Sequence, residues 1–378
     1  MNRHHIIKSV KIKQVLLLCF ILVQLLFVFS AMFVSCFPSM KASSLDKWSR
    51  TETLNTFMYA FQIENHYFTQ EFQKYGNSPR FSAIFLSMLT DVKINDLRTL
   101  MRNQLPGFSN YYSQIIVAGE GTDETNIPQD PNIPLEELLK QREADTTVLP
   151  PKKSTPPAKV NEQKIVFIYH SHSRESFLPM LPGTTNPNAA SSDKVNVSIL
   201  GERLAAKLEE QGIGATDNHV DIVDMLLKRG LNYVSSYNVS REVVQEAMSQ
   251  NQSFRYLIDI HRDSSRKAVT TKVINGKSYG RLYFVVGKEN QHYEENLQFA
   301  KTINEYLDKH YYGISRGIFL KDRREGNGVY NQDLSPNAML VEIGGVDNNV
   351  DELYRTVDVL AEAISAYHKQ AEKVSNPQ

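Results

Sequence analysis

The feature that most constrains the fold is an alternation of short apolar runs with longer amphipathic segments over residues 164–371. The apolar runs have the length of buried strands, and the other segments repeat apolar residues at i, i+3, i+4 and i+7, as helices do. The runs are KIVFIYH, RYLIDIH, RLYFVVG and NAMLVEIGG, and the helical segments are VNVSILGERLAAKLEEQG, HYEENLQFAKTINEYLDKH and VDELYRTVDVLAEAISAYHKQAEK. Strands that alternate with helices predict a three-layer α/β/α domain with a mostly parallel sheet, here over residues 164–375.

Three of the predicted strands end in side chains that can bind a metal or move a proton. In chain order these are His170, His172 and Glu175, then Asp259 and His261, and finally Glu342. The carboxyl ends of parallel strands meet at one edge of a sheet, where α/β proteins bind their ligands. Two histidines and a carboxylate form the ligand set of a catalytic zinc ion, which keeps a further position for water. The sequence therefore predicts a zinc site at this edge.

The period of a strand gives an expectation for how these side chains face. His170 and His172 are two residues apart and are expected on one face, with Glu175 folding back toward them from the turn beyond. Asp259 and His261 share a face by the same rule, and Asp259 is expected to accept a hydrogen bond that orients His261. A single histidine at a strand end is more often a satisfied core residue than a ligand. Three polar clusters in one sheet favour the metal, because unpartnered buried imidazoles and carboxylates are costly.

The remaining candidates carry weaker signals. His219 is a reserve ligand in a loop. Glu342 lies inside an apolar run, where the alternative to catalysis is a structural acid that caps the next helix or pairs with an arginine. Arg174 and Arg262 lie beside the ligands and are predicted to bind substrate, by steadying an oxyanion or a carboxylate. An exposed arginine near a strand end, however, is usually a solvated charge.

Composition excludes several classes of function. The 42 Lys and Arg residues balance 42 Asp and Glu residues, so the chain lacks the basic excess of a nucleic-acid-binding protein. Its two cysteines, Cys19 and Cys36, both lie in an apolar segment near the N-terminus. Beyond residue 36 a cysteine nucleophile, a cysteine-ligated metal or a disulfide framework is therefore impossible. Any metal there must be held by histidines and carboxylates.

The N-terminal segment predicts a membrane anchor over residues 14–37, with the apolar text VLLLCFILVQLLFVFSAMFVSCF. This run is long enough to cross a hydrocarbon core of roughly 30 Å. A cluster of basic residues precedes it, at Arg3, Lys8, Lys11 and Lys13, and no comparable cationic cluster follows it. Residues 1–13 are thus expected in the cytoplasm and the rest outside, as in a single-pass protein of the cell membrane. A cleaved signal peptide is the alternative, but its apolar core is shorter and no A-x-A site follows here.

Two further regions connect the anchor to the α/β domain. Residues 38–118 repeat apolar side chains at helical spacing and predict an extracytoplasmic helical region next to the membrane. Residues 119–163 are rich in proline, threonine and charge and predict a flexible linker with one short helical turn near PLEELLKQRE.

Several motifs together carry a resemblance to a known family. The pieces IYHSHSRESFLP, LIDIHRDSSR, YFVVGKEN, GISRGIFLKDR and YNQDLSPNAMLVEIGGVDNN, with the basic and then apolar N-terminus, resemble stage II sporulation protein P. Members of that family are membrane-anchored cell-wall hydrolases that Bacillus and Clostridium relatives use during engulfment of the forespore. The resemblance runs from about residue 164 to the end. It implies an amidase-like fold and a zinc-dependent N-acetylmuramoyl-L-alanine amidase, which cuts the amide between the lactyl group of the glycan and the stem peptide.

The resemblance also implies roles for particular residues. The zinc-binding histidines of the family match His172 and His261, and its catalytic glutamate matches Glu342. Related amidases take a glutamate ligand from the start of their first helix, where this sequence has Ser191, Ser192 and Asp193. We therefore expect Glu175 as the third zinc ligand, with Asp193 and His170 as alternatives. Glu342 would then take a proton from the zinc-bound water and deliver it to the departing amine.

Partners and alternatives follow from the same resemblance. It implies peptidoglycan as substrate, stage II sporulation proteins D and M as partners, and a place in the septal or engulfing membrane. A peptidase for stem-peptide cross-links would share the zinc site and release different products. A non-catalytic protein that grips peptidoglycan or a partner on a long tether would need no metal.

Overall fold

A computed structural model describes residues 114–123, 126–127, 134–149, 163–323 and 325–375. The predicted cytoplasmic tail, the predicted anchor over 14–37 and most of the predicted helical region over 38–118 lie outside these residues. Within the part of the chain that is described, no helix combines the length and the apolar character needed to cross a membrane.

A mixed seven-stranded sheet forms the centre of the domain, in the order β1-β8-β7-β9-β4-β2-β3. The strands are β1 (Gln114–Ala118), β2 (Lys164–Tyr169), β3 (Gly214–Asp217), β4 (Tyr256–Asp263), β7 (Leu282–Gly287), β8 (Ser315–Lys321) and β9 (Asn337–Gly345). Strands β9, β4, β2 and β3 run parallel to one another, whereas β7 is antiparallel to β9 and β1 is antiparallel to β8. The predicted mostly parallel α/β sheet is thus confirmed for the half that bears the candidate residues. A separate hairpin is formed by β5 (Thr271–Ile274) and β6 (Lys277–Gly280).

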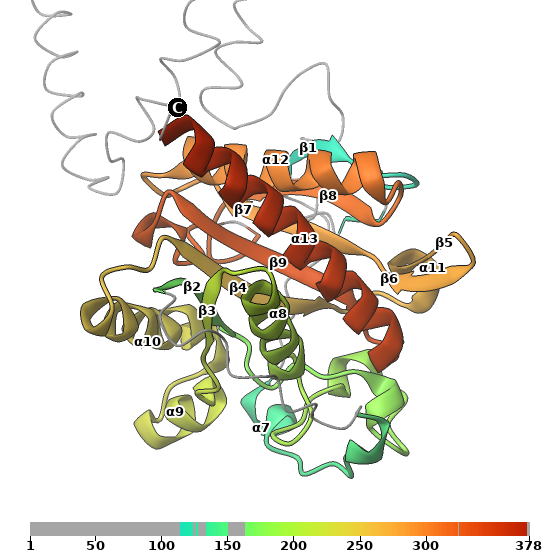
Figure 1. Ribbon diagram of the computed structural model, residues 1–378. Coiled ribbons are helices and arrows are strands. Elements are labelled where there is room, and N and C mark those ends of the chain that lie inside the picture. Colours follow the sequence, from blue (N-terminus) through green and yellow to red (C-terminus); the bar gives the residue numbers. More distant parts are fainter. Residues whose placement is uncertain (1–113, 124–125, 128–133, 150–162, 324, 376–378) are drawn as a thin grey trace, which may run out of the picture. The chain divides into compact units, whose positions relative to one another are not determined.

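Helices pack on both faces of the sheet. Three helices, α8 (Ser198–Glu210), α12 (Tyr293–His310) and α13 (Val350–Ser375), cover one face, and Figure 1 shows α13 running diagonally across it. On the other face α10 (Ser236–Gln250) packs on β2 and β4 through Val244, and α9 (Ile222–Arg229) lies next to α10. Short α11 (Lys267–Thr270) precedes the hairpin.

Alternation along the central strands decides what each face contains. On β4, Ile258 and Ile260 point into the main apolar core under α8, α12 and α13. Leu257 belongs instead to the cluster under α10. Because successive side chains of a strand point to opposite faces, Asp259 and His261 lie on the α10 side together with Leu257. Asp259 and His261 therefore point away from the main apolar core.

The segment before β2 is part of the folded domain. Strand β1 pairs with β8 over Gln114–Ala118, and α7 (Leu135–Leu138) buries Leu138 against Ile222 and Leu226 of α9. Farther along, the backbone N–H of Asp145 donates to the carbonyl of Met180 at 2.9 Å. The helical turn expected in the linker is α7. The described residues of 119–163 pack on the domain, however, and the last five residues of the predicted helical region form a strand.

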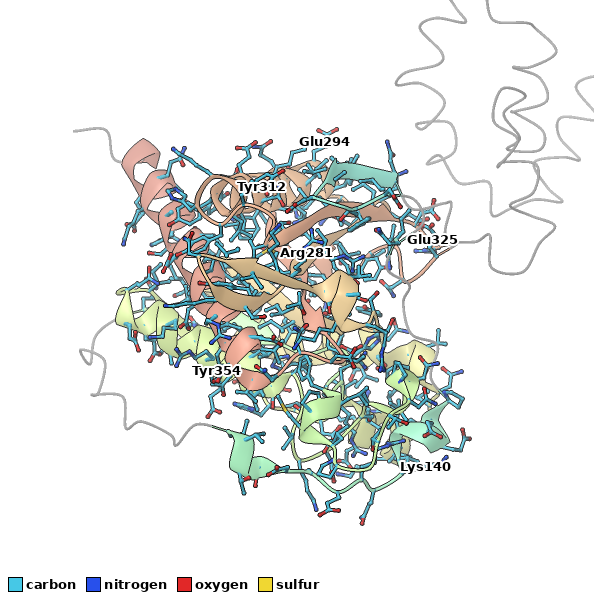
Figure 2. The ribbon with its side chains drawn as sticks, turned by 90° about the vertical axis from the view of Figure 1, so that its right-hand side faces the viewer. Lys140, Arg281, Glu294, Tyr312, Glu325 and Tyr354 are labelled. Carbon is cyan, nitrogen blue, oxygen red and sulfur yellow. The ribbon has the colours of Figure 1, made fainter. Side chains whose placement is uncertain are left out.

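Buried arginines fasten this segment to the sheet. Arg281, labelled in Figure 2, donates from Nη2 to the carbonyls of Glu120 at 2.6 Å and Ser315 at 3.2 Å. Arg316 of β8 donates to the carbonyl of Asn126 at 2.6 Å and forms an ion pair with Asp263 at the end of β4. Arg316 therefore connects the segment from β1 to Asn126 with Asp263, which lies two positions beyond His261.

Candidate metal centre

The candidate metal ligands and Glu342 meet at the carboxyl ends of three adjacent parallel strands. Strands β9, β4 and β2 are neighbours in the sheet, so residues that follow or end them converge. His172, Glu175 and His261 are all buried, and each offers one ligand atom within 4.8 Å of the others. The imidazole rings of His172 and His261 stand edge to face with centroids 4.7 Å apart. The structure thus brings together the three residues that the sequence predicted as ligands.

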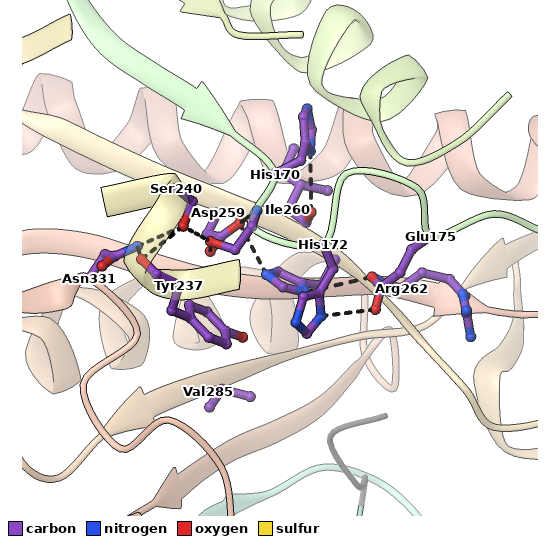
Figure 3. Close-up of polar contacts among 12 residues, drawn as sticks. His170, His172, Glu175, Tyr237, Ser240, Asp259, Ile260, Arg262, Val285 and Asn331 are labelled. Carbon is purple, nitrogen blue, oxygen red and sulfur yellow. Dashed lines mark hydrogen bonds and ion pairs between the residues drawn. The ribbon is translucent and has the colours of Figure 1, made fainter. Parts of the chain in front are cut away.

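Glu175 connects the two histidines. Its Oε1 lies 3.3 Å from Nδ1 of His172, and its Oε2 lies 3.6 Å from Nδ1 of His261. The backbone N–H of Arg262 donates to Oε2 at 2.9 Å. Figure 3 shows these contacts on one side of His172. A tight turn brings Glu175 back, since its N–H donates to the carbonyl of His172 at 3.1 Å. The expectation that Glu175 folds back from the turn is confirmed.

The expectation that His170 and His172 share a face is wrong. Strand β2 ends at Tyr169, and the chain turns before it reaches His172. His170 keeps the strand alternation and lies on the α8 side, with Nδ1 3.2 Å from the carbonyl of Ile260 and Nε2 3.2 Å from Oδ1 of Asp217. His172 turns to the α10 side, where its ring stacks on Tyr233 at a centroid distance of 4.7 Å. Side chains alternate between the two faces only while the strand continues, so the alternation does not extend to His172.

Glu342 lies next to His261 on the same face of the sheet. The two residues are direct partners in the register between β9 and β4. Glu342 is only 8% exposed, and among the described residues its Oε2 has no hydrogen-bond partner. Burial, together with the nearby carboxylates of Glu175 and Asp263, raises the pKa of Glu342 to about 8 against the opposing effect of His261. A carboxyl group with this pKa can take up or release a proton near neutral pH.

The buried carboxylates and imidazoles also stabilise each other's charged forms. Burial by itself would lower the pKa of His261, but Asp259, Glu175 and Glu342 outweigh it and raise the pKa to about 10. Burial would likewise raise the pKa of Glu175, but the hydrogen bond from His172 and the charges of His261 and Arg262 lower it to about 2. Three carboxylates therefore surround two imidazoles, an arrangement that favours positive charge at their centre.

The other residues considered as ligands lie outside this group. Asp193 is exposed on the surface, and His219 is 53% exposed with Nε2 3.1 Å from Oδ2 of Asp217. His170 contacts the same aspartate from inside the domain. Of the three alternatives for the third ligand, only Glu175 is in the group with both histidines.

The two arginines predicted to bind substrate have different surroundings. Arg174 donates from Nε and Nη2 to Oδ2 of Asp221, at 2.9 and 2.7 Å, and Asp221 is the N-cap of α9. Arg262 is buried and donates to the carbonyls of Asp263 and Ala190, both at 3.3 Å. Arg174 therefore links the turn before Glu175 to the N-terminus of α9. Arg262 contacts the carboxylate of Glu175 through its backbone N–H. The substrate-binding role of each stays a prediction.

Comparison with known proteins now adds the family. Residues 95–365 match the family described as stage II sporulation protein P (SpoIIP). A similar protein is stage II sporulation protein P of Bacillus subtilis (strain 168), 40% identical over 365 residues, which cover 93% of this chain and 90% of that protein. The chain belongs to the stage II sporulation protein P family. The resemblance in the sequence motifs is confirmed, and the match begins well before residue 164, in agreement with the packed segment at β1.

A solved structure also matches part of this family member. It is the N-acetylmuramyl-L-alanine amidase Ami1 from Mycobacterium smegmatis, with 16% sequence identity and a TM-score of 0.31. The match covers 55% of this chain and 98% of that one.

The chemistry of the group fits a divalent cation. Two imidazoles and a carboxylate are a common ligand set for zinc, and the hydrogen-bonded carboxylate of Asp259 behind His261 is the usual support for a metal-binding histidine. Asp259 lies beside His261, with Oδ1 3.0 Å from Nε2, but the contact does not have the geometry of the expected hydrogen bond. The unpartnered oxygen of Glu342 lies on the same side of the sheet. The buried group of His172, Glu175 and His261 could therefore hold a metal ion.

Some residues at the site were not predicted from the sequence. Tyr233, in a 3-10 turn over Tyr233–Ser235, and Tyr237 of α10 cover the two imidazoles. The ring of Tyr237 stacks on His261 with centroids 6.2 Å apart. The sequence NYVSSYNVS predicts at most a helix. It contains no signal that would place these two rings next to the ends of strands distant in the sequence.

Proposed function

We propose that this protein is a zinc-dependent peptidoglycan hydrolase, an N-acetylmuramoyl-L-alanine amidase that acts in engulfment of the forespore. The observation that carries the proposal is the buried group of His172, Glu175 and His261, with Glu342 beside it, whose Oε2 has no hydrogen-bond partner among the described residues. Membership of a sporulation family supports the biological setting. The amide as target rests on the family resemblance and on the chemistry that such a site provides.

Each residue has a separate task in this hydrolysis. His172, Glu175 and His261 would hold the zinc ion, which would supply polarisation of a carbonyl and a bound water whose pKa is lowered to about 7. Glu342 accepts the proton of the attacking water at its carboxylate and returns it to the nitrogen of the leaving amine. Its raised pKa of about 8 makes both transfers possible near neutral pH. Arg262 keeps Glu175 ionised and in place through its backbone N–H and its charge.

The remaining parts of the proposal concern location and substrate contacts. Residues 14–37 would anchor the chain in the cell membrane, with the catalytic domain outside it. Residues 1–13 would remain in the cytoplasm. Peptidoglycan would reach the group from the α10 side of the sheet, because the opposite side is filled by the apolar core under α8, α12 and α13.

The test combines metal analysis with identification of products. The full-length protein in detergent should contain about one zinc per chain and release stem peptides from purified cell wall, leaving free lactyl carboxyl groups that mass spectrometry detects. Glu342→Gln should keep the zinc while hydrolysis falls by about 10²- to 10⁴-fold. Glu352→Gln, at a buried glutamate on the other side of the sheet, is the matched control and should stay active.

Three outcomes would contradict the proposal. New amino groups on peptides without free lactyl carboxyls would indicate a peptidase for cross-links. Chelator-insensitive binding of cell wall without any product would indicate a non-catalytic binder. Full turnover by Glu342→Gln would remove that residue from proton transfer.

A further inference from the structure

A buried row of hydrogen bonds begins at Asp259, behind the candidate ligand His261. Oδ1 of Asp259 accepts from the backbone N–H of Ser171 at 2.9 Å, and Oδ2 accepts from the Ser171 hydroxyl at 2.6 Å. Nε2 of His261 lies 3.0 Å from Oδ1. All three side chains are buried. Asp259 thus receives donors from the turn after β2 and faces the ring of His261 with the same carboxylate.

The row continues through two more buried side chains to a loop before β9. The hydroxyl oxygens of Ser171 and Ser240 are 2.8 Å apart, and Ser240 accepts from Nδ2 of Asn331 at 3.0 Å. Nδ2 of Asn331 also donates to the carbonyl of Tyr237 at 3.2 Å. Figure 3 shows Asn331, Ser240 and Asp259 in line on the side of His172 away from Glu175. Four segments of the chain therefore meet behind one imidazole.

The donors in this row all point toward Asp259. An amide nitrogen only donates, so Asn331 gives a proton to Ser240. A carboxylate only accepts, so the single hydroxyl proton of Ser171 goes to Asp259. The proton of Ser240 then has two acceptors, Ser171 Oγ at 2.8 Å and the carbonyl of Tyr237 at 3.2 Å, and the nearer one is Ser171. Nε2 of His261 lies 3.0 Å from Oδ1 of Asp259, outside the geometry of a hydrogen bond, and Nδ1 on the other side of the ring lies 3.6 Å from Oε2 of Glu175.

The loop that supplies Asn331 has an unusual backbone. Tyr330 and Asn331 have φ angles of 55° and 56°, in the left-handed region that costs most residues energy. Tyr330 is fully buried, with its ring edge to face on Tyr237 at a centroid distance of 5.2 Å. Oδ1 of Asn327 accepts from the N–H of Tyr330 at 2.6 Å, and Gln332 donates to the carbonyl of Val285 at 2.8 Å. Such strain persists only where the surroundings fix it, and here it aims the Asn331 amide at Ser240.

We propose that Asn331, Ser240 and Ser171 are positioning residues that fix the Asp259 carboxylate beside Nε2 of His261 and so turn Nδ1 of that ring toward the metal. The inference rests on the metal site of the proposed function and extends it to three residues in separate parts of the chain. Supporting groups of this kind change metal affinity about 10- to 100-fold when they are removed.

The experiment uses the full-length protein in detergent, with ¹⁵N-labelled histidine, and two variants. Asn331→Asp keeps the shape and tolerates the left-handed backbone, but it replaces the donor with an acceptor. Ser240→Ala removes the link itself. Ser249→Ala is the matched control, because Ser249 lies on the same helix and donates to the carbonyl of Glu246 at 2.7 Å on the exposed side. Variants are compared by thermal unfolding to confirm that they fold.

The first readout is the proton on Nε2 of His261, identified by its absence in His261→Gln. The unaltered protein and Ser249→Ala should show a slowly exchanging Nε2–H signal, with or without zinc. Asn331→Asp and Ser240→Ala should exchange this proton at least about tenfold faster. They should also bind zinc about 10- to 100-fold more weakly in competition with a chelator.

The outcomes separate this inference from the proposed function. An unchanged Nε2–H signal and zinc affinity within about twofold in both folded variants would overturn the positioning role. A chain that shows the protected Nε2–H but binds no zinc would keep the hydrogen-bonded row and reject the metal site. A protein whose His261 carries its proton only on Nδ1 would refute the inference even if zinc binds.

Discussion

The two faces of the sheet are built from the same strands and have opposite characters. Ile260 and Ile343 point into the apolar core under α8, α12 and α13, while their neighbours His261 and Glu342 lie on the α10 side. One face fixes the positions of the strands by close packing, and the other uses those positions to hold polar groups near one another. The positions of the candidate site residues are fixed because the strands that carry them are packed tightly on their other face, against α8, α12 and α13.

Two buried glutamates show the same contrast. Glu352, at the start of α13, accepts from Ser278 at 2.7 Å and from Asn348 at 2.9 Å and pairs with Lys267 at 2.9 Å. Burial would raise the pKa of Glu352, but these donors lower it to about 2. Glu342 has an oxygen without a hydrogen-bond partner in the described chain, and its pKa is about 8. Glu352, a structural carboxylate, is thus surrounded by donors, whereas Glu342, the proposed proton carrier, keeps one oxygen without a donor among the described residues.

The largest expected effect is at the metal ligands. His172→Ala or His261→Ala should weaken zinc binding by more than about 100-fold, because each removes one of three ligands while second-layer groups alone contribute about 10- to 100-fold. Zinc content after dialysis and competition with a chelator measure this. A variant with one tightly bound zinc per chain would show that the histidine is not a ligand.

The next effect tests the apolar face. Phe299→Ala in α12 removes a fully buried ring that packs on Tyr256 and Tyr367, at centroid distances of 5.8 and 4.8 Å. It should lower the free energy of unfolding by about 3–5 kcal/mol in urea titrations. Zinc affinity of the folded variant should stay within about threefold. A large loss of zinc affinity would mean that the two faces are not separable.

A smaller effect concerns pH in the chelator-treated protein. Between its ordinary pKa of 4.5 and about 8, folded Glu342 keeps a proton that the unfolded chain has released. Its contribution to the free energy of unfolding is therefore complete below pH 4.5 and is lost as the pH rises to 8, with a slope of up to about 1.4 kcal/mol per pH unit. Glu342→Gln should flatten this slope in urea titrations at pH 5, 6, 7 and 8. Equal slopes in both proteins would show that the carboxyl is ionised throughout.

The smallest effect, of opposite sign, is expected at Glu352. Its folded pKa of about 2 lies below 4.5, so its contribution to stability is present above pH 4.5 and is lost as the pH falls toward 2. Glu352→Gln should reduce the loss of stability in this acid window and leave zinc affinity unchanged. If the variant unfolds in acid like the unaltered protein, the donors around Glu352 do not favour its ionised form.

The sequence was sufficient to predict the candidate residues at the strand ends, but not the side chains that surround them. His172, Glu175, His261 and Glu342 follow from apolar runs long enough to be read as parallel strands, and family motifs supported three of them. The face of His172 could not be predicted, because the end of β2 at Tyr169 depends on pairing with β3 and β4. Strand β8 was missed because Gly317, at φ 112°, interrupts its pattern. Ser171, Ser240 and Asn331 are small polar residues in separate segments, and only the folded chain brings them into line.

The pairing of β1 with β8 has a mechanical consequence. Tension in the chain ahead of Gln114 enters the domain through the hydrogen bonds of an edge strand, and from there through the bond between Asn126 and Arg316. Arg316 also holds Asp263, whose charge acts on Glu342. Asn126, Arg316 and Asp263 thus form a bonded path from the segment after β1 to the neighbourhood of the proposed proton carrier.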